Sequence, residues 1–476
     1  MGQSSAQTIG DALRFTSVQN TGTARYMSMG SSFGALGGDF SSLAQNPAGI
    51  GIYRSGQFTI SPGLELLNTE ATQYGERREE DNANFAMFNL GLINANELEN
   101  GGRWKFANFG VGYQRSRPFH NEMLYSGVQD VSSLSRFLAT GANGLFPEDF
   151  QDVDPFYLFP AWESFIFDPD TSTAIGDDYI GAVPDGKEVR QSTRIRTEGR
   201  IAETLIGGGV NYDDRLYLGI SIGFQRFVYE EFLAYTEEVL TPDENGISSF
   251  GYQQDTEILG DGINVRLGAI YRVNDIVRIG AAYTSPTWTQ LETNWSTSFS
   301  SSFTDGDGYF EPSPAIGYNR FNLRSPSRLL GSLGFVFGKR GLLNVDYEFV
   351  DYGRMKFDSS NDTPIDFTAD NAEIQRVHNS VGILRIGGEL RHKWLSLRAG
   401  YAYLPSPYVD GVLDYQKDQE MISGGLGFRM KNTSLDIAYR TNRFSGEQFA
   451  FQDGLQEPAR LDFINNSVVM TLGVRF

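Results

Sequence analysis

The sequence predicts an all-β protein, an antiparallel transmembrane β-barrel of about fourteen strands. Three observations lead to this fold class. Apolar residues alternate with polar ones over many segments, short and long connections alternate along the chain, and glycine and aromatic residues are abundant. The 476 residues include 54 Gly, 35 Phe and 23 Tyr. A hydrophobic content of 40% agrees with the prediction, because only every second residue of a membrane strand faces lipid.

Alternation is clearest in the ranges 216–224, 343–349, 395–403 and 435–439, where every second residue is apolar. Such a strand has one side in an apolar environment and one side in a wet one. The last strand follows the same rule and ends on an aromatic residue, with Val468, Met470, Leu472, Val474 and Phe476 at every second position. Outer-membrane barrels commonly end on such a stripe.

The connections alternate between two classes. Short turns are expected at 212–215, 273–275, 338–341, 391–393 and 431–433, and long polar loops at about 238–250, 298–316, 359–375, 405–418 and 448–461. An up-and-down outer-membrane barrel has this pattern, with short periplasmic turns and long external loops. The fourteen predicted strands lie near 55–67, 82–93, 104–116, 199–212, 215–235, 253–273, 276–296, 318–337, 342–358, 376–391, 394–404, 419–431, 433–446 and 463–476.

Composition excludes several functions. A net charge of −20 argues against nucleic acid as a partner, because its phosphates would be repelled. Cysteine is absent, which removes thiol nucleophiles and Cys-ligated metals. His120, His378 and His392 lack the sequence context of a catalytic serine, so we expect neither an enzyme nor a catalytic residue. We also expect no cofactor and no metal site.

The N-terminal region contains a recognisable motif. Residues 24–51 read ARYMSMGSSFGALGGDFSSLAQNPAGIG and contain the triplet Asn46-Pro47-Ala48. Further motifs are SPSR at 325–328, DYEF at 346–349, and LRAGYAY at 397–403 followed by PSPY. On these residues the chain resembles the FadL/TodX family of outer-membrane transporters of long-chain fatty acids and hydrocarbons, and the resemblance covers most of the chain.

The sequence suggests a domain organisation. Residues 1–6 would be the remnant of a processed signal, because Ser4-Ser5-Ala6 looks like the small-residue end of a cleavage site, and a long external loop is expected at about 117–198. The resemblance implies a hatch (plug) inside the lumen at 7–52 and the barrel at 53–476. It also implies that Asn46, Pro47, Ala48 and Gly49 lie in the hatch near a lateral gap beside a kinked third strand. Gly110 and Gly112 on that strand could permit the kink, although ordinary barrel curvature also explains them.

The external loop is rich in aromatic residues, which suggests two alternatives. Either the loop folds over the barrel mouth and lines a ligand site, or its rings form a small core of their own. The candidate ligand-lining residues are Phe146, Phe150, Phe156, Tyr157, Phe159, Trp162, Phe165 and Phe167. Residues 124–140 could form a short amphipathic helix there.

Several charged residues fall on the strand faces that should point inward. They are Asp346, Glu348, Arg385, Glu389, Arg398, Asp436 and Arg440. A basic group facing lipid would cost about 2–4 kcal/mol near the midplane, so these residues should face the lumen. Pairing with one another or with the hatch is one role, and binding a ligand carboxylate is the other.

The function implied by the resemblance is passive uptake of hydrophobic small molecules, such as long-chain fatty acids, with lateral exit into the bilayer. The protein would be a multi-pass barrel of the bacterial outer membrane, in contact with lipid and lipopolysaccharide. The alternative is a FadL-like barrel that acts as a scaffold or shuttle partner in a secretion complex. A porin-like pore for polar solutes is a third hypothesis, which the expected hatch disfavours.

Overall fold

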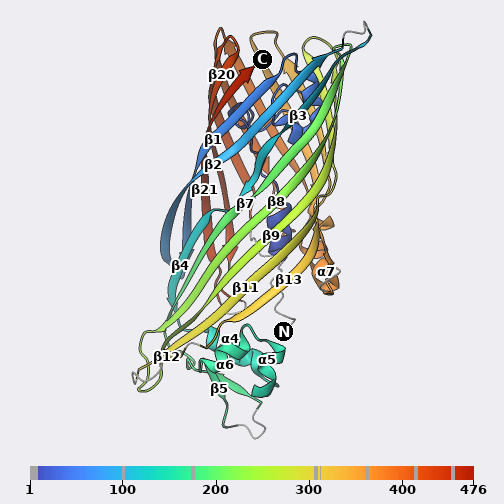
Figure 1. Cartoon of the computed structure of the whole chain (residues 1–476). Coiled ribbons are helices and arrows are strands. Elements are labelled where there is room, and N and C mark those ends of the chain that lie inside the picture. The colour runs from blue at the N-terminus through green and yellow to red at the C-terminus, as the bar shows by residue number, and fades with distance from the viewer. Residues whose placement is uncertain are drawn as a thin grey trace.

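Fourteen antiparallel strands close into one barrel in the computed structural model (Figure 1). The structure describes residues 9–98, 102–172, 177–304, 309–310, 312–360, 364–411, 416–451 and 456–476. The barrel closes because the first strand, β1, pairs with both β2 and the last strand, β21. The predicted fold class and strand number are thus confirmed.

Ten of the barrel strands are single segments: β1 (Gln57–Gln73), β2 (Glu76–Glu97), β7 (Val189–Tyr212), β8 (Leu216–Val239), β9 (Ile247–Arg272), β17 (Ser380–His392), β18 (Leu395–Leu404), β19 (Gln419–Met430), β20 (Thr433–Gln448) and β21 (Ala459–Arg475). The other four are interrupted. The first consists of β3 (Trp104–Pro118) and β4 (Asn121–Gln129), and the second of β10 (Val277–Thr284) and β11 (Trp288–Phe303). The third consists of β12 (Tyr309–Phe310), β13 (Ala315–Arg324) and β14 (Arg328–Val336), and the fourth of β15 (Gly341–Asp351) and β16 (Lys356–Ser359).

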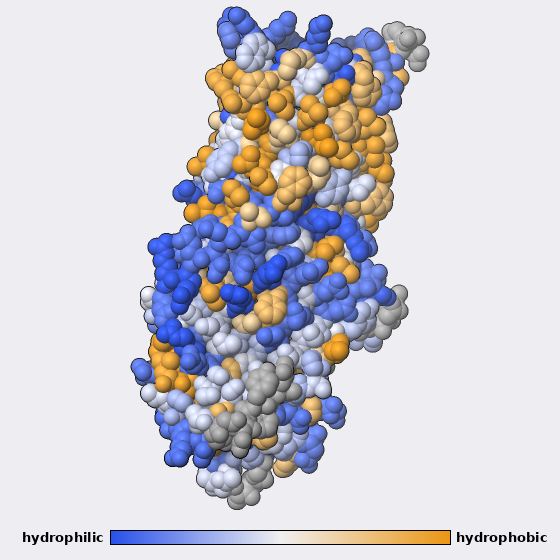
Figure 2. Space-filling model, turned by 60° about the vertical axis from the view of Figure 1, so that its left-hand side comes forward, coloured by the Kyte–Doolittle hydropathy of each residue, from blue (hydrophilic) through white to orange (hydrophobic). Residues whose placement is uncertain are grey.

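The outer surface is divided along the barrel axis (Figure 2). Apolar side chains gather on the half that contains the short turns, and hydrophilic ones dominate the other half. On β8, for example, the outward residues Leu218, Ile220, Ile222 and Phe224 are exposed, whereas Arg226 and Glu230 follow further along the strand. We call the apolar part the lipid band. No helix among the described residues is long and apolar enough to cross a membrane.

The hydrophilic half of the barrel is built from strand extensions that the sequence does not reveal. β7 begins at Val189, and β4 lies wholly within 117–198, the segment that we expected to be an external loop. Outside the lipid band the outward residues are polar, so the apolar alternation that marks a membrane strand is missing there. The expected helix at 124–140 is partly a strand for the same reason, and the helix α4 begins only at Leu134.

A small subdomain, the cap, stands at the long-loop end of the barrel (Figure 1). It consists of α4 (Leu134–Ala142), η2 (Pro147–Asp149), α5 (Phe150–Val153), α6 (Leu158–Glu163) and the two-stranded sheet of β5 (Phe167–Pro169) and β6 (Tyr179–Gly181). The 3-10 helix η3 (Tyr352–Arg354) and helix α7 (Thr368–Val377) lie beside the wall, and α7 occupies the first two residues of the strand predicted at 376–391.

The N-terminal segment, residues 9–53, lies inside the barrel (Figure 1). It contains α1 (Ile9–Thr16), α2 (Ala24–Met27), α3 (Ser42–Gln45) and η1 (Pro47–Ile52). Nearly every residue from 21 to 51 is buried, including polar ones such as Ser32 and Asn46. The segment therefore fills the lumen on the side of the short turns.

Candidate functional site

The N-terminal segment is attached to the barrel wall through a buried carboxylate. Asp346 of β15 accepts hydrogen bonds from the backbone N–H groups of Phe33 and Gly34, at 3.0 and 3.2 Å, and from the Gln45 side chain at 3.0 Å. The neighbouring Ser332 and Asn344 side chains also donate to it. A fully buried charge is tolerated only when it is hydrogen-bonded in this way.

Other inward charges hold further parts of the same segment. Glu348 pairs with Arg385 and Arg328, each at 2.7 Å, and Arg328 also donates to the carbonyl of Thr16 at the end of α1. Four further contacts complete the set. Arg25 pairs with Glu389 at 3.1 Å, and Arg398 pairs with both Glu389 and Asp436 at 2.6 Å. Arg440 donates to the carbonyl of Asn20 at 3.1 Å. The seven charges predicted to face the lumen are buried, and they contact one another or the N-terminal segment.

The Asn46-Pro47-Ala48 triplet lies against a different part of the wall from the one expected. The Asn46 amide donates to the carbonyls of Gly34, Ala269 on β9 and Ala281 on β10, and its oxygen accepts from the Ala48 N–H. A Cβ at Gly268 would lie 1.9 Å from the Asn46 oxygen. Asn46 therefore fixes the segment to β9 and β10, whereas Pro47 lies against Gly219 of β8 and Gly209 of β7. Gly49 packs on Ser42 within the segment.

Gly110 and Gly112 both lie in regular ladder positions between β2 and β7. Both receive side chains of the N-terminal segment. A Cβ at Gly110 would lie 2.9 Å from Leu43, and one at Gly112 would lie 2.5 Å from the ring of Phe40. Gly91, which faces Gly112 on β2, would meet the same ring at 2.3 Å. The two facing glycines thus form a hollow that Phe40 fills.

The β2–β3 ladder ends just beyond this hollow. β2 and β3 pair from Glu97–Phe106 as far as Asn89–Gln114, and no earlier residue of β2 pairs with β3 or β4. Both strands are irregular at this height, with a register shift in β1–β2 near Pro62 and another in β3–β7 between Arg115 and Arg117. Bulges of this kind bend strands and end pairing. We call the interval between residues 81–88 of β2 and 115–120 of the third strand the wall break.

The wall break has defined neighbours inside and outside the barrel. Inside, Gln114 donates to the Thr21 carbonyl at 2.7 Å, and the Gln19 N–H donates to the Ser116 carbonyl at 3.1 Å. Toward the long-loop end, β4 contacts β1, because Thr69 of β1 donates a hydrogen bond to the side chain of Asn121 of β4 at 2.8 Å. Outside, Phe85 of β2 is 69% exposed on the lipid band. The break therefore lies between the lipid band and the part of the lumen that residues 19–21 line, and its Arg115 forms a buried ion pair with Glu65 of β1 at 2.9 Å.

An aromatic cluster occupies the middle of the lumen around α1. The ring of Phe15 lies 5.9 Å from Phe119, 6.2 Å from Phe227 and 5.7 Å from Tyr229, measured between centroids. Side chains from β9, β11, β13 and α7 complete the cluster. The apolar part of the lumen is thus filled by the chain's own helix.

Beside α1 lies a small polar cavity of about 50 Å³ with a buried arginine. One terminal nitrogen of Arg266 contacts both oxygens of Glu203 at 2.9 Å. The other two nitrogens of Arg266 and the oxygen of Asn264 have no hydrogen-bond partner among the described residues. Because buried polar groups are normally satisfied, this cavity can receive an oxygen-bearing group.

Comparison with known proteins identifies the fold. The chain is 13% identical to a Pseudomonas aeruginosa FadL homologue, with a TM-score of 0.58 over 97% of this chain and 100% of the other. The Pseudomonas putida toluene transporter TodX is 15% identical, with a TM-score of 0.53 over 96% and 99%. The CymD monoaromatic hydrocarbon channel is 12% identical, with a TM-score of 0.52 over 96% and 98%.

The chain has the FadL-type barrel fold. No protein-family model and no curated protein sequence matches it. Of these solved proteins, TodX is described as a toluene transporter and CymD as a monoaromatic hydrocarbon channel. The lipid band of this FadL-type barrel is the surface that an outer-membrane barrel presents to the bilayer.

The cap of this FadL-type barrel shares a hydrophobic core with barrel strands β8, β9 and β11. Within it, the rings of Phe150, Trp162, Phe167 and Tyr179 lie between 5.3 and 5.8 Å from one another. The remaining candidate ligand-lining residues have different surroundings. Phe159 is partly buried in the same core, whereas Phe156 contacts Trp295 and Tyr157 contacts Tyr252 of the barrel. Phe146 and Phe165 are each 45% exposed.

In addition to the hydrophobic core that the cap shares with the barrel, a buried carboxylate joins the two parts. Glu237 of β8 is fully buried and accepts hydrogen bonds from Ser133 and Tyr235 at 2.6 Å, from the Leu134 N–H at 2.7 Å, and from Gln191 at 3.0 Å. Burial raises the pKa of the Glu237 carboxyl, and these hydrogen bonds oppose the shift. Sequence reasoning missed this residue because its strand segment lies beyond the lipid band, where no apolar alternation marks it.

Proposed function

We propose that this FadL-type barrel takes up hydrophobic small molecules across the outer membrane and releases them sideways into the bilayer through the wall break. The observation that carries the proposal is the end of the β2–β3 ladder at Asn89–Gln114, inside the lipid band. Lipid-facing backbone without partners is costly, so such a break is kept only where protein covers it or a passage is needed. Transport by related folds supports the same function.

In this proposal the N-terminal segment is a hatch. Its residues 19–21 contact the third strand at the break, and Phe40 fills the glycine hollow at the last β2–β3 pairs. A cargo molecule in the aromatic cluster would displace α1 and reach the break past residues 19–21. Moving an apolar chain from water to such a path gains about 0.8 kcal/mol per CH₂ group, so passive uptake needs no energy source.

Photo-crosslinking tests the lateral exit. Benzoyl-phenylalanine replaces Phe85 at the break or, as a matched control, Phe224, which lies on the lipid band away from the break and is 46% exposed. During the first seconds of uptake of a radiolabelled fatty acid, we expect crosslinked cargo at position 85 and at least ~tenfold less at 224. Equal labelling at both positions would mean that cargo reaches them from the bulk bilayer, and lateral exit would then be rejected.

The polar cavity suggests the cargo class. A carboxylate head could accept a hydrogen bond from one of the free nitrogens of Arg266, with its chain among the rings around Phe15. A pure hydrocarbon would leave these groups unsatisfied. We therefore propose an amphipathic acid, such as a long-chain fatty acid, in preference to a neutral aromatic molecule.

A scaffold function is the second candidate, and one observation favours it. Within the described residues two cavities beside the N-terminal segment are small, about 40 and 50 Å³, and the aromatic cluster is filled by α1. A scaffold needs no passage. If the purified protein carries another protein in stoichiometric amount and binds no fatty acid, the scaffold function replaces uptake.

A further inference from the structure

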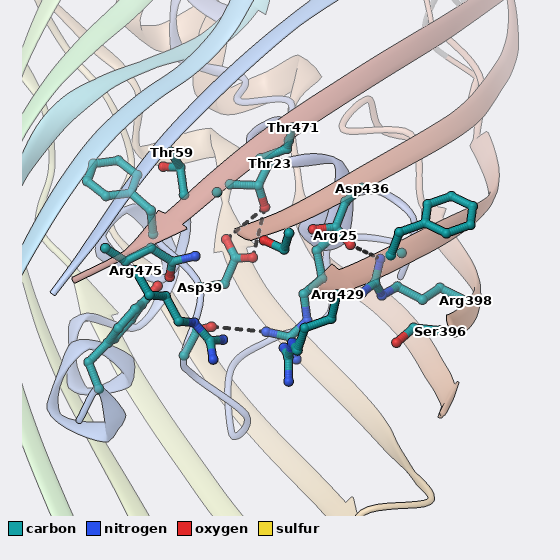
Figure 3. Close-up of a pocket in the computed structure, with 18 residues that line it drawn as sticks. Thr23, Arg25, Asp39, Thr59, Ser396, Arg398, Arg429, Asp436, Thr471 and Arg475 are labelled. Carbon is teal, nitrogen blue, oxygen red and sulfur yellow. Dashed lines mark hydrogen bonds and ion pairs between the residues drawn. The ribbon is translucent and has the colours of Figure 1, made fainter. Parts of the chain in front are cut away.

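A second polar cavity lies at the short-turn mouth of the barrel, on the opposite side of the N-terminal segment from the aromatic cluster (Figure 3). Its lining residues come from strand ends: Gln57 is the first residue of β1, Ser396 and Ser434 are the second residues of β18 and β20, and Arg475 is the last residue of β21. The cavity therefore belongs to the periplasmic mouth in the orientation that short turns define.

Arginine dominates this cavity. Arg25, Arg398, Arg429 and Arg475 line it, whereas Asp39 and Asp436 are its only carboxylates. Figure 3 shows the side chains of Arg25, Arg429 and Arg475 extending toward one another from three different elements. Like charges brought together in this way repel one another unless an anion joins them.

Both carboxylates of the cavity are already engaged. Asp39 accepts from the Thr23 hydroxyl at 2.8 Å and from the Ser41 N–H at 3.0 Å, and Asp436 pairs with Arg398 at 2.6 Å. Arg25 pairs with Glu389 just outside the cavity lining. By contrast, the side chains of Arg429 and Arg475 make no hydrogen bond or ion pair with any residue that the structure describes. The uncompensated charge of the cavity is thus positive.

The size and chemistry of the cavity limit the ligand. A volume of about 40 Å³ holds roughly three water molecules at ~10–15 Å³ each, so one small group fits and an acyl chain does not. Guanidinium groups are planar forks that match the oxygens of carboxylates and phosphates. Hydroxyl groups of Thr23, Ser396 and Ser434 on the lining can add further donors.

We propose that the short-turn mouth is a binding site for an oxyanion, a phosphate or carboxylate group, held by Arg25, Arg429 and Arg475. The ligand enters from the periplasmic side, because the cap at the other end carries twelve acidic and two basic residues between 130 and 188 and repels anions. The oxyanion can be free or can belong to the head group of an anionic phospholipid. The proposal is independent of the uptake function.

Titration of the purified full chain in an uncharged detergent tests the site. Inorganic phosphate and acetate are the probes, and calorimetry gives their affinity. The test variant is the double substitution Arg429→Gln and Arg475→Gln, at two exposed positions. The matched control is Lys339→Gln and Arg340→Gln, which removes the same charge from the exposed turn between β14 and β15 at the same end of the barrel.

We expect saturable binding of phosphate by the wild type, a loss of affinity of about tenfold or more in the test variant, and less than about twofold change in the control. No binding by the wild type at 50 mM probe would overturn the proposal, and so would an equal loss in both variants, which indicates diffuse electrostatics. Nanodiscs distinguish the sources. If phosphatidylglycerol discs, but not phosphatidylcholine discs, compete with phosphate, the ligand is a lipid head group; if neither competes, it is a free oxyanion.

Discussion

The ring of Phe40 occupies the space that a side chain of Gly112 would need, since a Cβ built on Gly112 lies 2.5 Å from the Phe40 Cζ atom. This contact joins the N-terminal segment to the third strand two residues before the β2–β3 ladder ends at Gln114. Loss of the ring would therefore open space beside the wall break rather than elsewhere in the lumen.

Phe40→Ala should make the barrel leaky at the break. Removing a buried Phe side chain costs about 3–5 kcal/mol, part of which is the cavity that remains. We expect faster uptake of a fluorescent fatty acid into cells, measured as the initial rate. Leu36→Ala is the control, because Leu36 lies in the same segment but packs near β14 and β15. If Leu36→Ala gives the same increase, general loosening of the segment explains the result, and the glycine hollow has no special role.

Asp346→Ala should detach the N-terminal segment from β15. The substitution leaves the backbone N–H groups of Phe33 and Gly34 and the Gln45 amide without their acceptor, and each buried unsatisfied donor costs about 1–3 kcal/mol. We expect strongly increased hydrogen exchange in residues 30–36 and a lower melting temperature by electrophoresis of the folded barrel. Asp261→Asn, at an exposed position that is paired only with Arg226, should change neither quantity. Unchanged exchange in the Asp346 variant would show that the other ion pairs hold the segment alone.

The part of the fold that lies in the lipid band could be predicted from the sequence, and the part outside it could not. Lipid imposes alternation on residues such as Leu218 and Ile220, so the strands of the band were found within a few residues. Glu76–Asn84 of β2 and Val189–Arg200 of β7 carry polar residues on both faces, and nothing in their pattern separates an extended strand from a loop.

The candidate site was predictable to a similar degree. Inward charges such as Asp346 and Glu389 were found because a charge within an apolar alternation must face the lumen. The hollow around Phe40 and the pairing of Arg266 with Glu203 join residues that are far apart in the sequence, so no local pattern signals them. We expected Gly112 to permit a kink, whereas the structure shows that it makes room for the ring of Phe40.

The attachment of the cap should weaken as the pH rises. Burial raises the pKa of Glu237 in the folded protein, so the folded state binds the proton more tightly than the unfolded state does. Its contribution to stability is therefore fully present below the unfolded pKa and is lost as the pH rises through the folded pKa. We expect hydrogen exchange in residues 134–142, corrected for the intrinsic rate, to show less protection at pH 8 than at pH 5. Glu237→Gln should flatten this dependence, whereas Glu238→Gln, at the exposed neighbouring position, should keep it. Protection that increases with pH in the wild type would contradict the assignment.

Arg266 should determine whether an acidic cargo binds. Substituting Arg266 alone would leave the buried Glu203 without its partner, so the informative variant is the double substitution Arg266→Gln and Glu203→Gln, which removes both charges of the pair. A hydrogen bond to a charged group contributes about 1.5–3 kcal/mol, so the affinity for a long-chain fatty acid should fall about tenfold to a hundredfold. The affinity for a neutral hydrocarbon such as toluene should stay within about twofold. Both affinities can be measured by displacement of a fluorescent probe from the purified barrel. A parallel loss of both ligands would indicate a general change in the lumen, and an unchanged fatty-acid affinity would show that the carboxylate head lies elsewhere.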